Sequence, residues 1–241
     1  MSGPRPDRAF LTARPFAHRG LHGPCASENG MAAFDAAITA GFGIECDARA
    51  SRDGVAFLFH DAGMARMTGR DDRIAALDAV AIDAITLPDG GTIPRLSGLL
   101  ARCGGRVPLL VEIKAPDRQV GPLCMSVARA ADAWPGAPVA VMSFNPAVGR
   151  WFARHRPATV RGLVVTAQGK GVLRGRVERT LALLLAKPDF LACDIRDLPS
   201  SFTRRARARG LPVLSWTVRT DAERARASVH ADQMIFERPH D

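Results

Sequence analysis

Short apolar or β-branched segments alternate with helical patterns of ten or more residues along this chain. Such alternation is typical of repeated βα units around a parallel sheet. The length of 241 residues suits one closed barrel of this kind, for which roughly 250 residues are usual. No internal repeat or linker is evident. The sequence therefore predicts one domain, 1–241, of the α/β class with the fold of a (β/α)8 TIM barrel.

Eight strands are expected from short apolar runs that end at polar residues or turn signals. They are 15–17, 43–49, 107–113, 138–143, 160–165, 190–194, 212–217 and 233–236. Helical patterns lie between them, at 31–40, 96–103, 120–133, 147–155, 173–186, 200–209 and 221–230. One helical pattern thus lies between each pair of consecutive strands, as a barrel requires.

The second and third strands are separated by 50–106, which is too long for one helix and its loops. Asp53-Gly54 is a hairpin signal, and 55–60 is expected to be the returning strand. The segment also has apolar residues that need burial, which argues against a disordered loop: Ile74, Leu77, Val80, Ile82, Ile85 and Leu87. We expect a small insertion after the second strand, at about 54–104, that caps the barrel mouth.

The bulk composition indicates a soluble cytoplasmic protein. Residues 1–14 lack the apolar core of a secretory signal, and the most apolar helical run, 181–186, is far shorter than the ~20 residues that cross a bilayer. The five cysteines are an odd number without C-x-x-C spacing, so we expect reduced thiols.

The net charge of +9 is concentrated in two segments, +8 over 149–187 and +5 over 200–229. Solvated outer helices are the simpler interpretation of this pattern, and an anion-attracting surface is the alternative. The sequence does not indicate an oligomeric state.

Acidic residues stand at the ends of two predicted strands. Glu45 and Asp47 are two apart and project to the same face of the second strand, and the same parity pairs Glu112 with Lys114 in the third. Buried carboxylates side by side repel one another unless a cation lies between them. Ligands that are all oxygen favour Mg²⁺ or Ca²⁺ over zinc, so we expect a divalent metal site here.

Two histidines stand at comparable positions, because His18 follows one apolar run and His60 ends another. The carboxyl ends of barrel strands are where such enzymes place their chemistry. Two imidazoles can divide the roles of base and acid, while Arg19 and Lys114 can bind phosphate oxygens. These groups fit metal-assisted attack on a phosphate ester. We interpret His22, His155, His230 and His240 as structural or exposed.

These segments identify a resemblance. One known family has the motifs A-H-R-G, P-E-N-T/S, I-E-x-D, D-G and H-D in this order. The corresponding segments here are Ala17-His18-Arg19-Gly20, Ser27-Glu28-Asn29-Gly30, Ile44-Glu45-Cys46-Asp47, Asp53-Gly54 and His60-Asp61. Further matches are Met64–Gly69, Ile93–Leu96, Glu112-Ile113-Lys114, Ser143-Phe144 and Trp216-Thr217-Val218. From about 15 to 239, the chain resembles the glycerophosphodiester phosphodiesterase family.

The resemblance implies a barrel with an insertion after its second strand, and an enzyme that releases glycerol 3-phosphate and an alcohol. It implies Glu45, Asp47 and Glu112 as metal ligands and His18 and His60 as acid and base. It further implies that Arg19 and Lys114 contact the phosphate, with Glu28 near the metal or the glycerol hydroxyls and Trp216 as an apolar wall. Direct attack by water and attack by a glycerol hydroxyl both remain open.

Some positions depart from the family pattern. Ser27 and Gly30 replace Pro and Thr/Ser, Arg219 replaces Asn after W-T-V, and Phe236-Glu237-Arg238-Pro239 replaces T-D-x-P. Activity is still expected because the metal and proton-transfer groups are intact. Arg219 adds positive charge at the mouth, so we expect it to influence substrate preference.

Three alternatives remain open. The enzyme can be a lysophospholipase D acting on lysophospholipids at an anionic membrane, through weak peripheral contact by its basic half. It can be a catalytically inactive barrel. A basic binding module for nucleic acid is disfavoured, because aromatic residues make up 6% of the chain, tyrosine is absent, and no nucleic-acid motif occurs.

Overall fold

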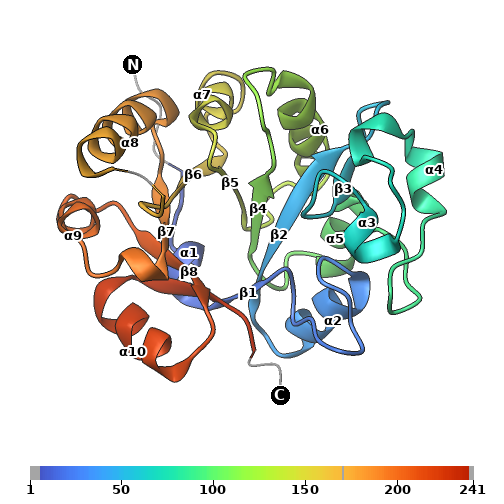
Figure 1. The fold of residues 1–241 in the computed structure, drawn as a ribbon, viewed down its shortest axis with the longest axis horizontal. Helices are drawn as coiled ribbons and strands as arrows, with labels where there is room; N and C mark the ends of the chain where they lie inside the picture. Colours follow the sequence, from blue (N-terminus) through green and yellow to red (C-terminus); the bar gives the residue numbers. More distant parts are fainter. Residues whose placement is uncertain (1–5, 170, 239–241) are drawn as a thin grey trace.

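The computed structural model describes residues 6–169 and 171–238, within which eight parallel strands close into a barrel (Figure 1). The ring closes because the first strand pairs with both the second and the last. In ring order the strands are β1 (Phe16–His18), β2 (Gly43–Ala50), β4 (Leu109–Ile113), β5 (Val139–Ser143), β6 (Val160–Val165), β7 (Phe190–Asp194), β8 (Val213–Val218) and β9 (Gln233–Phe236). The predicted (β/α)8 fold is confirmed.

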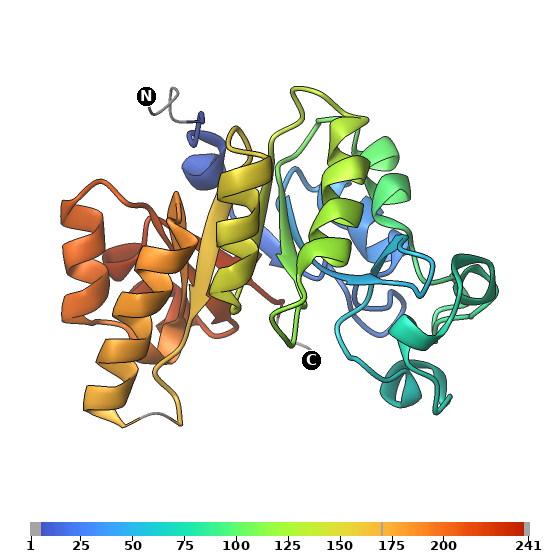
Figure 2. The same cartoon turned by 90° about the horizontal axis from the view of Figure 1, so that it is seen from above.

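Helices cover the outside of the ring (Figures 1 and 2). They are α2 (Met31–Thr39), α5 (Leu96–Cys103), α6 (Gly121–Asp132), α7 (Pro146–His155), α8 (Val172–Ala186), α9 (Ser201–Ala208) and α10 (Asp221–His230), with a short 3₁₀ turn η2 (Ile195–Asp197) after β7. All seven lie where helical patterns were expected. The sequence analysis missed α1 (Phe10–Ala13), because four residues are too few to show a helical period.

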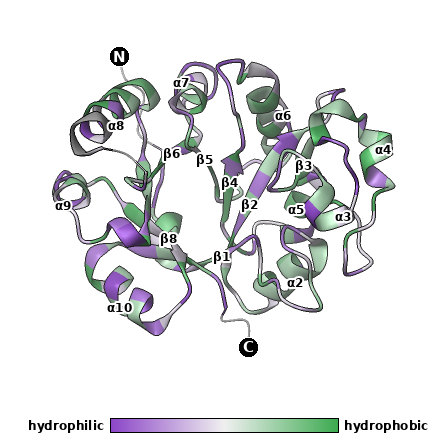
Figure 3. Ribbon diagram, in the orientation of Figure 1, coloured by the Kyte–Doolittle hydropathy of each residue, from purple (hydrophilic) through white to green (hydrophobic). Residues whose placement is uncertain are grey.

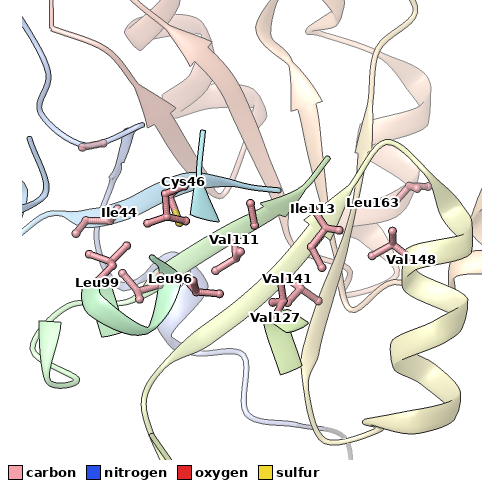
Figure 4. Packing of buried hydrophobic residues seen from close by; sticks show 14 of the residues in the cluster. Ile44, Cys46, Leu96, Leu99, Val111, Ile113, Val127, Val141, Val148 and Leu163 are labelled. Atoms are coloured by element: carbon pink, nitrogen blue, oxygen red, sulfur yellow. The ribbon is translucent and has the colours of Figure 1, made fainter. Parts of the chain in front are cut away.

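The core has two layers separated by the strands. Outward-facing strand residues pack against the helices, and Figure 4 shows Ile44, Cys46 and Val111 beside Leu96 and Leu99 of α5. Inward-facing residues fill the barrel, where Leu11 of α1 joins the interior cluster. Since strand neighbours alternate between the two layers, Glu45 and Asp47 face inward while Ile44 and Cys46 face the helices.

Two aromatic rings fill the bottom of the barrel. A Cβ at Gly43 would lie 2.5 Å from the Phe16 ring, and a Cβ at Gly162 would lie 2.3 Å from the Phe190 ring. Glycine at both positions therefore makes room for a ring that crosses the interior. The polar side chains at the opposite ends of the strands rest on a solid apolar floor.

The segment between β2 and α5 forms its own small cluster beside the ring (Figure 1). Its strand β3 (Ala56–Leu58) runs antiparallel to β2, as the hairpin signal predicts. Three short helical pieces follow: α3 (Ala65–Thr68), η1 (Ile74–Ala76) and α4 (Ala79–Asp83). Phe57, Phe59, Met64, Ile74 and Ile82 are the centre of the cluster. The expectation that Val80 needs burial is wrong, since this side chain is 80% exposed.

The five cysteines form no disulfide, and four of them are buried while Cys25 is exposed. Among the helices that the structure describes, none is long and apolar enough to cross a membrane.

Candidate active site

The carboxyl ends of the strands surround a cavity of about 430 Å³. Most of the predicted site residues line it: His18, Arg19, Glu45, His60, Glu112, Lys114, Trp216 and Arg219. Asp47 lies directly behind this lining and is fully buried. Glu28 reaches the same place through a hydrogen bond from Arg19. The structure therefore brings together all the side chains that the sequence analysis selected.

Three carboxylates form the centre of the site. Asp47 on β2 is the register partner of Glu112 on β4, and Glu45 stands two residues before Asp47. One oxygen from each of the three lies within 4.8 Å of the others. All three side chains are buried, so water screens their mutual repulsion only weakly.

Two fixed cations lie against this trio. The Lys114 Nζ atom is 2.9 Å from Asp47 Oδ1 and 2.7 Å from Glu112 Oε1. Arg19 Nε is 3.2 Å from Asp47 Oδ2. Asp47 thus contacts both cations and Glu112 contacts one. Glu45 contacts neither of these two side-chain charges and accepts a hydrogen bond from the Arg19 backbone amide at 3.1 Å.

The pKa values follow this unequal sharing. Burial opposes ionisation of Asp47, but the charges of Lys114 and Arg19 outweigh it and hold its pKa well below the ordinary value. For Glu45, burial and then the Asp47 charge raise the pKa well above the ordinary value. Burial likewise raises the pKa of Glu112, against the effect of Lys114. The site therefore lacks positive charge when all three groups are ionised.

A divalent cation fits this deficit. Glu45 Oε1 is buried and accepts no hydrogen bond from any described residue. The three converging donors are all carboxylate oxygens, which hard ions such as Mg²⁺ and Ca²⁺ prefer. An unpaired buried carboxylate oxygen is costly unless a cation or donor approaches it.

Each predicted catalytic histidine contacts a carboxylate that does not belong to the acidic trio. His18 Nδ1 lies 2.5 Å from Glu237 Oε1, and His60 Nδ1 lies 2.7 Å from Asp61 Oδ1. Because Nδ1 is engaged in both rings, Nε2 is the atom left for chemistry; that of His18 is 3.9 Å from Glu45 Oε2. Burial lowers the pKa of both imidazoles below the ordinary value. Both therefore favour the neutral form, which can accept a proton.

Glu237 is in turn fixed by Arg219. Burial would raise the pKa of Glu237, but hydrogen bonds from His18 and Arg219 lower it to about 2. Arg219 donates through Nε at 2.6 Å and through a terminal nitrogen at 3.1 Å. Two residues that depart from the family pattern therefore meet in one ion pair, and Arg219 acts on His18 through Glu237.

A further cation joins the insertion to the barrel. Arg66 of α3 donates to Asp61 Oδ2 at 2.6 Å and to both oxygens of Glu28, at 2.6 and 3.0 Å. Glu28 also accepts a hydrogen bond from Arg19 at 3.0 Å. This chain of contacts connects the partner of His60 to Arg19, one of the cations beside the acidic trio.

Asn29 fixes the most central carboxylate. Its amide donates to Asp47 Oδ2 at 2.9 Å, and its carbonyl oxygen accepts from the Asp47 backbone N–H at 3.0 Å. Asn29 has a φ of +55°, a conformation that asparagine adopts more readily than most residues. Neighbouring Arg19 has a φ of +56° and directs its own amide to Glu45. This backbone strain is located where it orients the acidic trio.

An apolar wall faces the polar groups across the cavity. Trp216 packs edge to face against Phe144, with ring centroids 5.4 Å apart. The Trp216 indole N–H donates to the Ala192 carbonyl at 2.9 Å, which fixes the plane of the ring.

Sequence reasoning assigned no role to Asn29, Asp61, Arg66 or Glu237. Asn29, Asp61 and Arg66 lie in the matched segments and Glu237 lies in a segment that departs from the family pattern, but a motif does not show which side chains contact one another. His22, which was interpreted as structural or exposed, lies close to His18 and Glu237. His155 stacks on Trp151 on the outer surface. His240 and Pro239 are outside the described residues.

Comparison with known proteins decides the family. Residues 18–239 match the glycerophosphoryl diester phosphodiesterase family. The chain belongs to this family. The resemblance seen in the sequence is thereby confirmed, and the carboxylate trio and both histidines lie within the matched range.

Individual relatives are more distant. Over 85 residues, the chain is 40% identical to "Probable glycerophosphodiester phosphodiesterase 2" of Mycobacterium tuberculosis, a match that covers 35% of this chain and 32% of that protein. The chain therefore matches only about a third of the length of this curated relative.

Solved structures share the fold over almost the whole chain. A Silicibacter pomeroyi DSS-3 protein of the same family name has a TM-score of 0.81 and 22% identity, covering 94% of this chain and 90% of its own. An Oleispira antarctica phosphodiesterase, solved with the product sn-glycerol-3-phosphate, has a TM-score of 0.79 and 20% identity, covering 94% and 93%. At such identities the likeness shows the fold alone.

The Asn29 contacts give a first prediction. Asn29→Ala removes both hydrogen bonds to Asp47 and leaves a buried N–H without its acceptor, so the free energy of unfolding should fall by about 1–3 kcal/mol. Urea unfolding followed by circular dichroism measures this. The exposed amide Gln119 is the control, since Gln119→Ala should change stability by less than about 0.5 kcal/mol. Equal stability of the two variants would contradict the role given to Asn29.

Proposed function

We propose that this protein is a divalent-metal-dependent phosphodiesterase that hydrolyses glycerophosphodiesters to glycerol 3-phosphate and an alcohol. One observation carries the proposal: a buried carboxylate trio with too few cations lies between two imidazoles, each held by its own acidic partner. Family membership supports the reaction class. The product bound to the Oleispira antarctica relative supports glycerol 3-phosphate as the product here.

In this proposal Glu45, Asp47 and Glu112 hold Mg²⁺ or Ca²⁺. The ion would supply charge to stabilise the phosphate oxygens and to orient the diester. Such ions acidify bound water much less than Zn²⁺ does, so side chains of the protein must still move the protons.

Arg19 and Lys114 bind the phosphate from the cavity wall. Arg19 presents a planar fork suited to two oxygens, while Lys114 presents a compact charge with three donors. Ion pairs with the acidic trio raise the pKa of Lys114 despite its burial, so it remains charged at neutral pH.

His18 and His60 share the proton transfers. One ring, with Nε2 unprotonated, takes a proton from the attacking oxygen. The other enters the reaction as an imidazolium paired with its carboxylate and gives its Nε2 proton to the departing alkoxide. Glu237 and Asp61 fix the ring orientation and stabilise each imidazolium as it forms. The same pair serves whether water or a glycerol hydroxyl attacks first.

Substrate contacts complete the proposal. Trp216 and Phe144 form an apolar wall for the carbon skeleton, and Glu28 and Arg219 add polar groups near the rim. We further propose that the chain functions in the cytoplasm as one domain, with about 54–104 as an inserted cap. The odd number of cysteines supports a reducing compartment.

Release of glycerol 3-phosphate from a panel of glycerophosphodiesters with different head groups tests the reaction. Activity should disappear when the enzyme is treated with a chelator and return when Mg²⁺ or Ca²⁺ is added in excess, because the trio lacks positive charge without an ion. Full activity in the chelator would contradict the metal requirement. Failure to release glycerol 3-phosphate from any panel member would contradict the reaction itself.

Substitutions test the assigned residues. We expect His18→Ala, His60→Ala and Glu45→Ala each to lower kcat by roughly 100-fold or more, since each removes a positioned acid, base or ligand. His155→Ala is the matched control, because His155 lies on the outer surface of α7. Steady-state kinetics give the comparison, and near wild-type rates in all three site variants would refute the assignment.

A further inference from the structure

One outer helix carries an unexplained apolar stripe. Of the six large apolar side chains that are clearly exposed in the described residues, three lie on α8: Val177 is 53% exposed, Leu181 60% and Leu184 69%. Their spacing of four and three residues places them on one face of the helix. Scattered apolar residues on a surface are ordinary, but a continuous stripe marks a surface that binds something.

The fold does not need this stripe, because α8 packs through its opposite face. Ala186 is buried, and Ala182 and Leu183 pack against the main core. A Cβ at Gly149 of α7 would lie 2.8 Å from the Ala186 Cβ, so these two helices are already in close contact. Val177, Leu181 and Leu184 belong to none of the core clusters.

Helices with basic outer faces flank the stripe on both sides. In Figure 1, α8 lies between α7 and α9, and Arg179 of α8 lies over the Phe202 ring of α9 at 5.5 Å. Exposed arginines that form no ion pair with a described residue are Arg150 and Arg154 on α7, and Arg204, Arg205 and Arg209 on or next to α9. Neither flanking helix contains an acidic residue. Figure 3 shows green apolar stretches on α8 next to the purple of its charged residues.

We propose that this surface, formed by the stripe of α8 and the arginines of α7 and α9, docks the enzyme on an anionic lipid bilayer. An apolar face that enters the headgroup boundary, with cations on either side, is the pattern of helices that lie in a membrane interface. Arginine stems can extend along the bilayer while their guanidinium groups meet lipid phosphates.

Charge and area favour a bilayer over other occupants. Two copies docked through this face would bring their arginines together, and like charges across an interface disfavour association. The apolar part of this surface is only three side chains, fewer than the apolar centre of a stable protein interface contains. Nucleic acid would contact the arginines through its phosphates, but it would not bury the exposed leucines.

Docking through α8 places the barrel on its side. The helices of a (β/α)8 barrel run along its outside, antiparallel to the strands, and the amino end of each helix follows the carboxyl end of its strand. The mouth would therefore open along the bilayer surface rather than into it. This inference does not rest on the proposed reaction, because docking can be measured without substrate.

Co-sedimentation with vesicles tests the proposal. The full-length protein should bind vesicles of equimolar phosphatidylglycerol and phosphatidylcholine, bind pure phosphatidylcholine vesicles much less, and be released by salt. The double variant Leu181→Gln/Leu184→Gln should bind the anionic vesicles roughly tenfold or more weakly, because it loses the apolar contact. Arg150→Gln/Arg154→Gln should also weaken binding and reduce its dependence on salt.

Val229→Gln is the matched control, since Val229 is 64% exposed on the different helix α10; it should leave vesicle binding unchanged. Melting curves confirm that each variant is folded. Absence of vesicle binding, or unchanged binding by the double leucine variant, would overturn the proposal. Loss of a wild-type dimer in the leucine variant, seen by sedimentation velocity, would assign the stripe to a second copy. Tight binding to duplex DNA without vesicle binding would assign the arginines to nucleic acid.

Discussion

Repulsion among three buried carboxylates is the constraint on which the rest of the site depends. Glu45, Asp47 and Glu112 face one another inside the barrel, where Lys114 and Arg19 supply only two compensating charges. A parallel barrel makes this arrangement possible, because neighbouring strands in register present their inward side chains at the same level. The rings of Phe16 and Phe190 fill the barrel below the trio, so the mouth is the open side from which a further cation can approach.

The surrounding polar groups maintain this arrangement. Asn29 fixes Asp47, and Arg19 adopts a left-handed backbone conformation that directs its amide to Glu45. The histidines are fixed in the same way, since Glu237 contacts the Nδ1 atom of His18 and Asp61 contacts that of His60. Arg219 and Arg66 then hold those two carboxylates. Proton-transfer groups and charge-binding groups thus belong to one connected network of ion pairs.

The sequence predicted the strands, the outer helices and the principal site residues, because these depend on local patterns. Alternation in β2 showed that Glu45 and Asp47 share a face, and the ends of apolar runs located His18 and His60. The sequence could not reveal that Arg219 contacts Glu237 or that Arg66 contacts both Asp61 and Glu28, since these contacts connect distant segments and depend on side-chain geometry. The sequence analysis also missed α1, which is too short to show a helical period. It predicted that Val80 is buried, whereas Val80 lies on the exposed face of its helix.

Calorimetric titration of the metal-stripped protein with Mg²⁺ or Ca²⁺ tests the central claim most directly, because it measures the ion without any catalytic step. The account predicts one bound ion per chain, with affinity reduced at least roughly tenfold in Glu45→Gln and in Glu112→Gln. It also predicts that the affinity falls as the pH is lowered, because burial raises the pKa of both glutamates and protons then compete with the ion for their oxygens. No saturable binding to the wild-type protein, or equal binding by both variants, would contradict the claim that a cation completes this site.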